Sequence, residues 1–77
     1  MDMKKLRFDL EQLIGKNIWL SITTRKFTDE DVTEARYAGQ LAGYAPGVGD
    51  SILIVFIGGF SATVNPTDVS AKVDTLR

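Results

Sequence analysis

The sequence contains no cysteine and no histidine. Without cysteine it has no disulfide bond, no thiol nucleophile and no cysteine-ligated zinc, and without histidine it lacks the commonest acid–base group. Serine and threonine are frequent, but a serine nucleophile needs a base that histidine ordinarily provides. We therefore expect a protein that is not an enzyme and that uses no cofactor, no metal and no small-molecule substrate.

The sequence also lacks an excess of either charge. Lysine and arginine number 9, and aspartate and glutamate number 10, which gives a net charge of −1. Such a chain has no global positive field to attract phosphate groups. A nucleic-acid site would have to be a local basic patch.

Long hydrophobic runs are missing as well. The longest apolar stretch, at positions 52–57, has six residues, whereas a membrane-spanning helix needs about 20. The basic residues near the start are followed by Asp9, Glu11 and Gln12 rather than by the apolar segment of a signal peptide. The sequence thus predicts a soluble, cytoplasmic protein that does not enter a membrane.

The 77 residues suffice for one small domain, 1–77. A chain of this size without disulfides relies on a dense core or on association with another chain. Self-association into a homo-oligomer is therefore an expectation from length alone.

Positions 3–14 show helical periodicity, with Leu6, Leu10 and Leu13 on one side and charged residues between them. Asp2 is suited to cap the first turn, because its carboxylate can accept free backbone N–H groups. Gly15 is suited to end the helix, because glycine tolerates a left-handed conformation. The pattern predicts an amphipathic helix.

Five antiparallel strands are predicted over positions 16–76. Ile18, Leu20 and Ile22 alternate with polar residues in the first strand. A polar loop at 25–32 leads to a long strand at 33–44, which contains Gly39 and Gly43. Glycine inside a strand usually marks a bend, a bulge or a close backbone approach.

The second half of the chain predicts three shorter strands. A turn at 45–50 precedes a strand at 51–57 that is apolar on both faces, so the surplus face needs cover from the helix, a second subunit or a target protein. Gly58 and Gly59 predict a two-residue hairpin turn of the primed type before a strand at 60–64. Positions 65–69 predict one tight helical turn, in which Asp68 satisfies a free N–H, and a last strand covers 71–76.

This order of elements resembles the small five-stranded barrels of the Sm-like and Src-homology-type group. The resemblance is carried by the bent strand with Gly39 and Gly43, the Gly58-Gly59 hairpin and the turn at 65–69. It implies a mainly β fold, a five-stranded antiparallel barrel with an N-terminal helix. Sm-like proteins would further imply a ring of subunits that bind RNA through loops, but the corresponding turns here do not match that family's nucleotide-binding motifs, and no family site is carried over.

Two loops offer weaker hypotheses. The glycine-rich segment 47–50 could cradle a phosphate, but it leads into a strand rather than a helix, which favours an ordinary turn. The segment 28–34 could bind a hard cation, but its spacing does not fit a calcium loop, which favours a solvated acidic loop. The acidic residues of that segment are Asp29, Glu30, Asp31 and Glu34.

A local basic patch near the start of the chain is the best nucleic-acid candidate. Trp19 lies in the same stretch, where its ring either stacks on a base or packs beneath the helix. The basic residues of this candidate patch are Lys4, Lys5, Arg7, Lys16, Arg25 and Lys26.

From these observations we predict a small non-catalytic protein-binding module, an adaptor or inhibitor of a larger cellular machine, of phage or mobile-element origin. The alternatives are an Sm-like oligomer that binds nucleic acid through the basic patch and a structural subunit of a larger assembly. Loops on a rigid barrel are the favoured contact surfaces. The candidate partner-binding residues are Phe27, Asp29, Glu30, Asp31, Trp19, Tyr44 and Val48.

Overall fold

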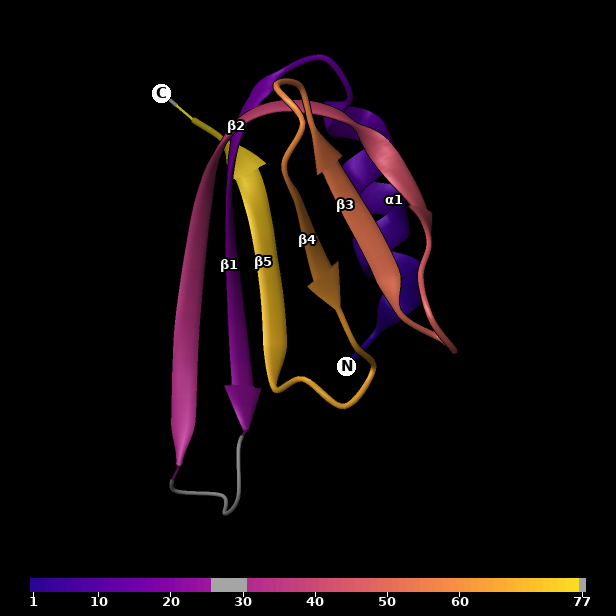
Figure 1. Cartoon of the computed structure of the whole chain (residues 1–77), viewed down its shortest axis with the longest axis vertical. Helices are drawn as coiled ribbons and strands as arrows, with labels where there is room; N and C mark the ends of the chain where they lie inside the picture. Colours follow the sequence, from indigo (N-terminus) through magenta and orange to yellow (C-terminus); the bar gives the residue numbers. More distant parts are fainter. Residues whose placement is uncertain (26–30, 77) are drawn as a thin grey trace.

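The computed structural model describes residues 1–25 and 31–76. It is mainly β with one N-terminal helix, which confirms the predicted fold class. The elements in chain order are α1 (Met3–Leu13), β1 (Asn17–Arg25), β2 (Val32–Pro46), β3 (Ile52–Phe56), β4 (Ser61–Val64) and β5 (Ser70–Thr75) (Figure 1).

The five strands form one antiparallel sheet in the order β4-β3-β2-β1-β5. β2 is shared by both halves of this sheet, because its first part pairs with β1 and its last part pairs with β3. The register shifts between Leu41 and Gly43, where β2 bends over to reach β3 (Figure 1). One long bent strand therefore organises the sheet.

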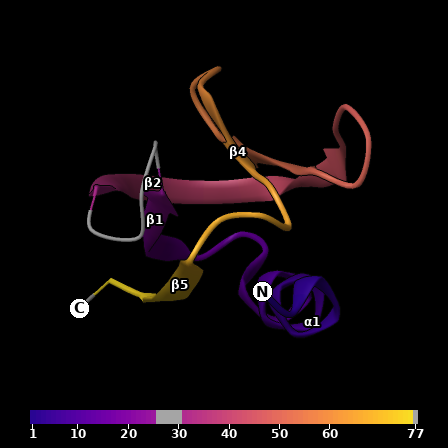
Figure 2. The same cartoon turned by 90° about the horizontal axis from the view of Figure 1, so that it is seen from below.

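Closure into a barrel is not found among the described residues, where β4 and β5 each form an edge of the sheet. The helix contacts β5 and β2, and it lies beside β5 while the β3–β4 hairpin rises on the other side of β2 (Figure 2). The sequence predicts a barrel that closes strand to strand. The structure instead has a curved sheet with one helix packed against it.

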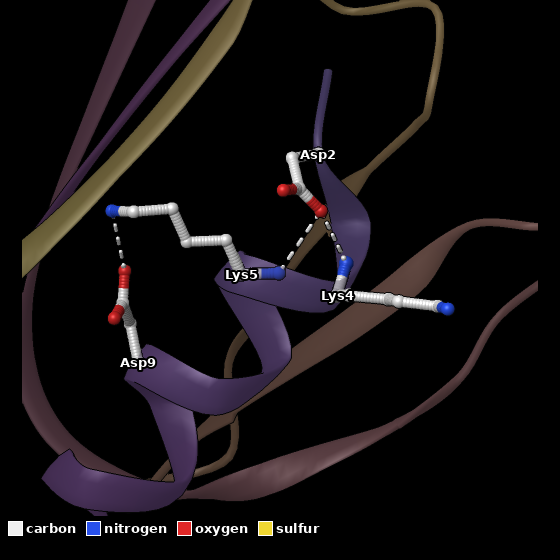
Figure 3. A network of polar contacts seen from close by, with 4 residues as sticks. All are labelled: Asp2, Lys4, Lys5 and Asp9. Atoms are coloured by element: carbon white, nitrogen blue, oxygen red, sulfur yellow. Dashed lines mark hydrogen bonds and ion pairs between the residues drawn. The ribbon is translucent and has the colours of Figure 1, made fainter.

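The caps of α1 are those that the sequence predicts. The Asp2 carboxylate accepts hydrogen bonds from the backbone N–H groups of Lys4 and Lys5, each at 3.1 Å (Figure 3). Gly15 has a φ of 86°, in the left-handed region that glycine tolerates. The helix ends at Leu13, one residue before the predicted limit.

The core lies between the helix and the concave face of the sheet. Leu6 and Leu10 of α1 are buried, and β1 buries every second residue, as the alternation predicts. The buried apolar residues of the core are Leu6, Leu10, Ile18, Leu20, Ile22, Leu41, Ile52, Ile54, Phe56, Ala62 and Val64.

The two glycines of β2 serve different purposes. A Cβ at Gly39 would lie 3.2 Å from the Phe56 ring and 3.3 Å from the Phe60 ring. These rings stack with their centroids 4.5 Å apart, so the absent side chain allows the aromatic pair to approach the strand. Gly43 lies at the register shift. The predicted close approach and bulge are both confirmed.

The two apolar faces of β3 differ in burial, as the sequence predicts. Ile52, Ile54 and Phe56 are buried in the core that the helix also joins. Leu53 and Val55 point the other way and are half-buried, beside small residues of β2 and β4. The helix joins the core on the buried face, and the opposite face keeps partial contact with solvent.

One of the two turn predictions needs correction. The β3–β4 connection includes Ile57 as well as the two predicted glycines, because Phe56 N–H donates to the Phe60 carbonyl at 2.9 Å and closes the hairpin one residue earlier. Both glycines have positive φ, as predicted. Positions 65–69 form one tight turn, in which Asp68 N–H donates to the Asn65 carbonyl at 3.0 Å. The Asp68 carboxylate accepts the Asn65 N–H at 2.9 Å, as predicted.

The described helix is too short to cross a bilayer.

The contribution of the helix to the core can be measured by shortening one side chain. Leu10 is fully buried, so Leu10→Ala should lower the free energy of unfolding by about 2–5 kcal/mol through lost burial and a residual cavity. Urea unfolding checks this value. Phe8→Ala on the exposed side of the same helix is the matched control, since Phe8 is 62% exposed and its removal should change stability little. Equal losses for both variants would contradict this packing.

Candidate functional site

One surface hollow is a groove between the first turns of α1 and the turn that joins β2 to β3. It has a volume of about 600 Å³. Its lining combines apolar side chains with a few charged ones. The residues that line it are Met1, Asp2, Met3, Lys4, Arg7, Tyr44, Ala45, Pro46, Gly49, Asp50, Ser51, Ile52 and Pro66.

The charged groups in this groove differ in whether they already have a structural role. The Asp2 carboxylate already serves as the helix cap, and its charge is further offset by the positive end of the helix dipole. The Lys4 side chain extends away from Asp2 (Figure 3), and Lys4 and Arg7 are both exposed. The helix side of the groove is thus net positive, while Asp50 supplies a carboxylate at the turn side.

Tyr44 fixes the position of α1 on β2 at the groove wall. Its hydroxyl donates a hydrogen bond to Glu11 Oε1 at 2.6 Å. This hydrogen bond raises the pKa of Tyr44 above its ordinary value, because the phenol must keep its proton to donate, while the Arg7 charge acts weakly in the opposite direction. Tyr44 is half-buried, and its ring packs against the core.

The turn at 47–50 closes as an ordinary turn, which is the reading that the sequence favours. Gly47 N–H donates to the Ser51 carbonyl at 3.0 Å, and the Ser51 hydroxyl donates to the Val48 carbonyl at 2.6 Å. Val48 is 93% exposed at the tip of this turn, next to the groove. Of the predicted partner-binding residues, Tyr44 lines the groove and Val48 adjoins it.

The second hollow lies on the outer face of β1, β2 and β5, with a volume of about 390 Å³. It contains Trp19, which is 36% exposed. The prediction that Trp19 packs beneath the helix is therefore wrong, because α1 lies on the face of β1 that carries the buried alternate residues. Its other lining residues are Leu20, Ser21, Glu34, Arg36 and Lys72.

A short polar network crosses this outer face. Arg36 Nε donates to Glu34 Oε1 at 2.6 Å, and the Ser21 hydroxyl donates to Glu34 Oε2 at 3.0 Å. The hydrogen bond from Arg36, then that from Ser21, lowers the pKa of Glu34 below its ordinary value. Glu34 is therefore a fixed negative charge beside a fixed positive one.

The predicted basic residues are distributed over several surfaces. Lys4 and Arg7 share the groove, whereas Lys5 pairs with Asp9 at 3.4 Å (Figure 3). Lys16 precedes β1 and Arg25 ends it. A strand of this length spans about 30 Å at 3.3 Å per residue. These two side chains cannot share one phosphate contact surface. Lys26 lies outside the described residues.

The acidic segment is only partly described. Phe27, Asp29 and Glu30 lie outside the described residues, and Asp31 is half-buried just before β2. Within residues 1–25 and 31–76, no three carboxylates come together in a way that could hold a metal ion.

Sequence reasoning misses Arg36 and Lys72, which line the same hollow as Trp19. Alternation along each strand indicates which residues share a face, but Lys72 shares this hollow with Trp19 only because β5 pairs with β1. Met3 and Pro46 of the groove are also missed, although an exposed proline after a long strand is a signal of a turn surface.

Comparison of the chain with protein-family models, with curated proteins and with solved structures finds no match.

The hydrogen bond from Tyr44 to Glu11 can be tested by titration. A folded pKa above the ordinary 10.0 means that its stabilisation is fully present below about pH 10 and is lost as the pH rises through the folded value. In a Tyr37→Phe background, which leaves Tyr44 as the sole tyrosine, ultraviolet absorbance should show phenol ionisation above 10.0.

Adding Glu11→Ala should move that ionisation back towards 10.0. It should also remove the part of the stability loss at alkaline pH that comes from ionisation of Tyr44. Adding Asp9→Ala, which removes a carboxylate of the same helix bonded to Lys5 instead, should leave the titration in place. An ionisation that Glu11→Ala does not shift would contradict the hydrogen bond.

Proposed function

We propose that this chain is a non-catalytic protein-binding module whose groove holds an extended acidic segment of a partner protein. The single observation that carries the proposal is a groove with an apolar lining and two exposed cations, which outnumber Asp50, the lining carboxylate that does not cap the helix. A volume of about 600 Å³ falls in the range of binding clefts. The same element order also supports our proposed resemblance to the Sm-like and Src-homology-type barrels.

The apolar part of the groove suits side chains of a peptide. Met1 and Met3 supply flexible, polarisable contacts that adapt to different shapes. Tyr44 supplies a ring whose position is held by its hydrogen bond to Glu11. An adaptable wall opposite a fixed aromatic ring favours a peptide over a small polar solute.

The charged part of the groove selects an acidic segment. Lys4 and Arg7 lie on the helix side, close to the helix N-terminus, which itself favours anions. The hydroxyl of Ser51 in the same lining donates to the Val48 carbonyl, so it is held as a structural group and not as a nucleophile. These contacts support binding rather than catalysis.

Selection from a random peptide library tests the groove directly. Selected peptides should carry aspartate or glutamate next to apolar residues, because the groove pairs cations with an apolar wall. Their affinity, measured by fluorescence anisotropy, should fall at least about tenfold with Arg7→Glu, which reverses a contact charge. Tyr44→Ala should weaken binding by a similar factor through loss of its ring.

The matched control is Lys72→Glu, an identical charge reversal on the outer face. It should leave peptide affinity unchanged. Selected peptides without acidic residues, or equal effects of Arg7→Glu and Lys72→Glu, would refute the groove as the binding site.

A second candidate function is binding of single-stranded nucleic acid on the outer face. The specific observation is that the Trp19 ring, which is 36% exposed, lines one hollow together with Arg36 and Lys72. Stacking of a base on such a ring, with cations nearby for phosphate, is the usual basis of sequence-tolerant binding. The set of cations differs from the predicted patch, which only partly comes together.

Trp19 is the only tryptophan, so its fluorescence reports directly on this face. If nucleic acid binds there, an oligonucleotide should quench Trp19, and Lys72→Glu should weaken that quenching more than Lys4→Glu. The affinity should fall steeply with added salt. No quenching at low salt would exclude this second function, and a greater effect of Lys4→Glu would locate the site on α1 instead.

A further inference from the structure

The first half of β2 has one free backbone edge. Leu41 N–H donates to the Lys16 carbonyl at 3.0 Å, and hydrogen-bonded pairs in an antiparallel ladder recur at every second residue. On the opposite edge, the Gln40 carbonyl accepts the Ile57 N–H at 2.8 Å, which confirms this alternation. The residues whose N–H and C=O groups face that opposite edge are therefore Val32, Glu34, Arg36 and Ala38.

This edge is unpaired in the described part of the chain, because β3 pairs with β2 only from Leu41 onward. The residues from Val32 to Arg36 are all exposed. The first half of β2 projects with β1 beyond the other strands (Figure 1). Exposed edges of this kind readily accept another strand.

The other two sheet edges are less suited to accept a strand. β4 has only four residues. On β5, Leu76 N–H bonds to the Asn17 carbonyl, so the same alternation turns the Thr75 N–H towards the free edge. The Asp74 carboxylate accepts that N–H at 2.7 Å. β2 thus offers the longest edge with free backbone groups.

We propose that β2 pairs antiparallel with β2 of a second copy of this chain, about a two-fold axis at Ala35. In this register Glu34 of one copy lies opposite Arg36 of the other, and the reverse pair forms by symmetry. The facing pairs Glu34–Arg36 and Val32–Ala38 belong to the set with free backbone groups, so each of these pairs can exchange two hydrogen bonds.

Charge selects this register over its neighbours. A shift of the axis to Glu34 places that residue opposite its own copy, and a shift to Arg36 does the same for the arginine. Like charges directly opposite each other are destabilising, whereas opposite charges stabilise. Glu34 and Arg36 already contact within one chain at 2.6 Å, so the pairing at Ala35 completes a ring of four alternating charges.

Apolar contacts support the same register. Val32 is 47% exposed and comes to lie opposite Ala38 of the second copy. Ala38 is itself paired with Trp19 of β1. The small alanine leaves room for Val32 to approach the exposed indole, so an otherwise solvated ring becomes covered on dimer formation.

Charge reversal gives a decisive test. Glu34→Arg and Arg36→Glu each place like charges across the axis, so each variant alone should dimerise at least about tenfold more weakly than the natural chain. An equimolar mixture of the two variants restores both opposite-charge pairs and should form a heterodimer. The double variant Glu34→Arg with Arg36→Glu should dimerise like the natural chain. Sedimentation velocity over a range of concentrations measures all four samples.

A backbone variant separates pairing from charge. Ala38→Pro removes an N–H that faces the free edge and none that bonds to β1, so the chain should fold but remain monomeric. Circular dichroism checks the fold of every variant. A natural chain that stays monomeric at millimolar concentration, single variants that dimerise normally, or a mixture that forms no heterodimer would each overturn the proposal. None of these outcomes depends on the groove, so the proposed function is judged separately.

Discussion

The backbone of Leu41 ties the two halves of the molecule together. Its N–H donates to the Lys16 carbonyl at 3.0 Å, and its carbonyl accepts the Gly15 N–H at 2.8 Å. Its side chain is fully buried, and the register shift of β2 follows immediately. One residue therefore anchors the end of the helix, the start of β1 and the bend of β2. The position of every other element follows from where that bend lies.

The bend divides β2 into two surfaces of different character. Beyond it, Tyr44 and Pro46 face the helix and line the groove. Before the bend, Glu34 and Arg36 lie on the part of β2 whose outer edge carries backbone groups that are unpaired within the described residues. The proposed groove and the proposed pairing edge therefore lie on opposite sides of the bend in β2.

The sequence predicts the elements better than their contacts. Asp2 and Gly15 mark the helix correctly because capping depends on local chemistry. Gly39 and Gly43 mark the bent strand because glycine within a strand indicates a bulge or a close approach, although the pattern does not reveal that the Phe56 and Phe60 rings are what approaches Gly39. Periodicity places Trp19 on the polar face of β1, but the side on which the helix packs is decided by tertiary burial. That burial is what leaves the indole exposed.

The candidate site was less predictable for the same reason. Tyr44 meets Glu11 only because α1 packs against β2. No pattern within either segment predicts how the two elements pack. Closeness along the chain predicts the basic patch, yet Lys16 lies just before β1 and Arg25 is its last residue. Strand register and helix docking are long-range properties, and single-segment patterns do not contain them.

The contact of α1 with β5 also constrains how the chain folds during synthesis. The apolar stripe of the helix, with Leu6 and Leu10, packs in a core that Val73 of β5 helps to cover. Because β5 is translated long after the helix, that stripe stays uncovered while most of the chain emerges. Contacts between distant parts of a chain form slowly, and the intermediates expose apolar surface that can aggregate. The helix can therefore complete its packing only after β5 has been made.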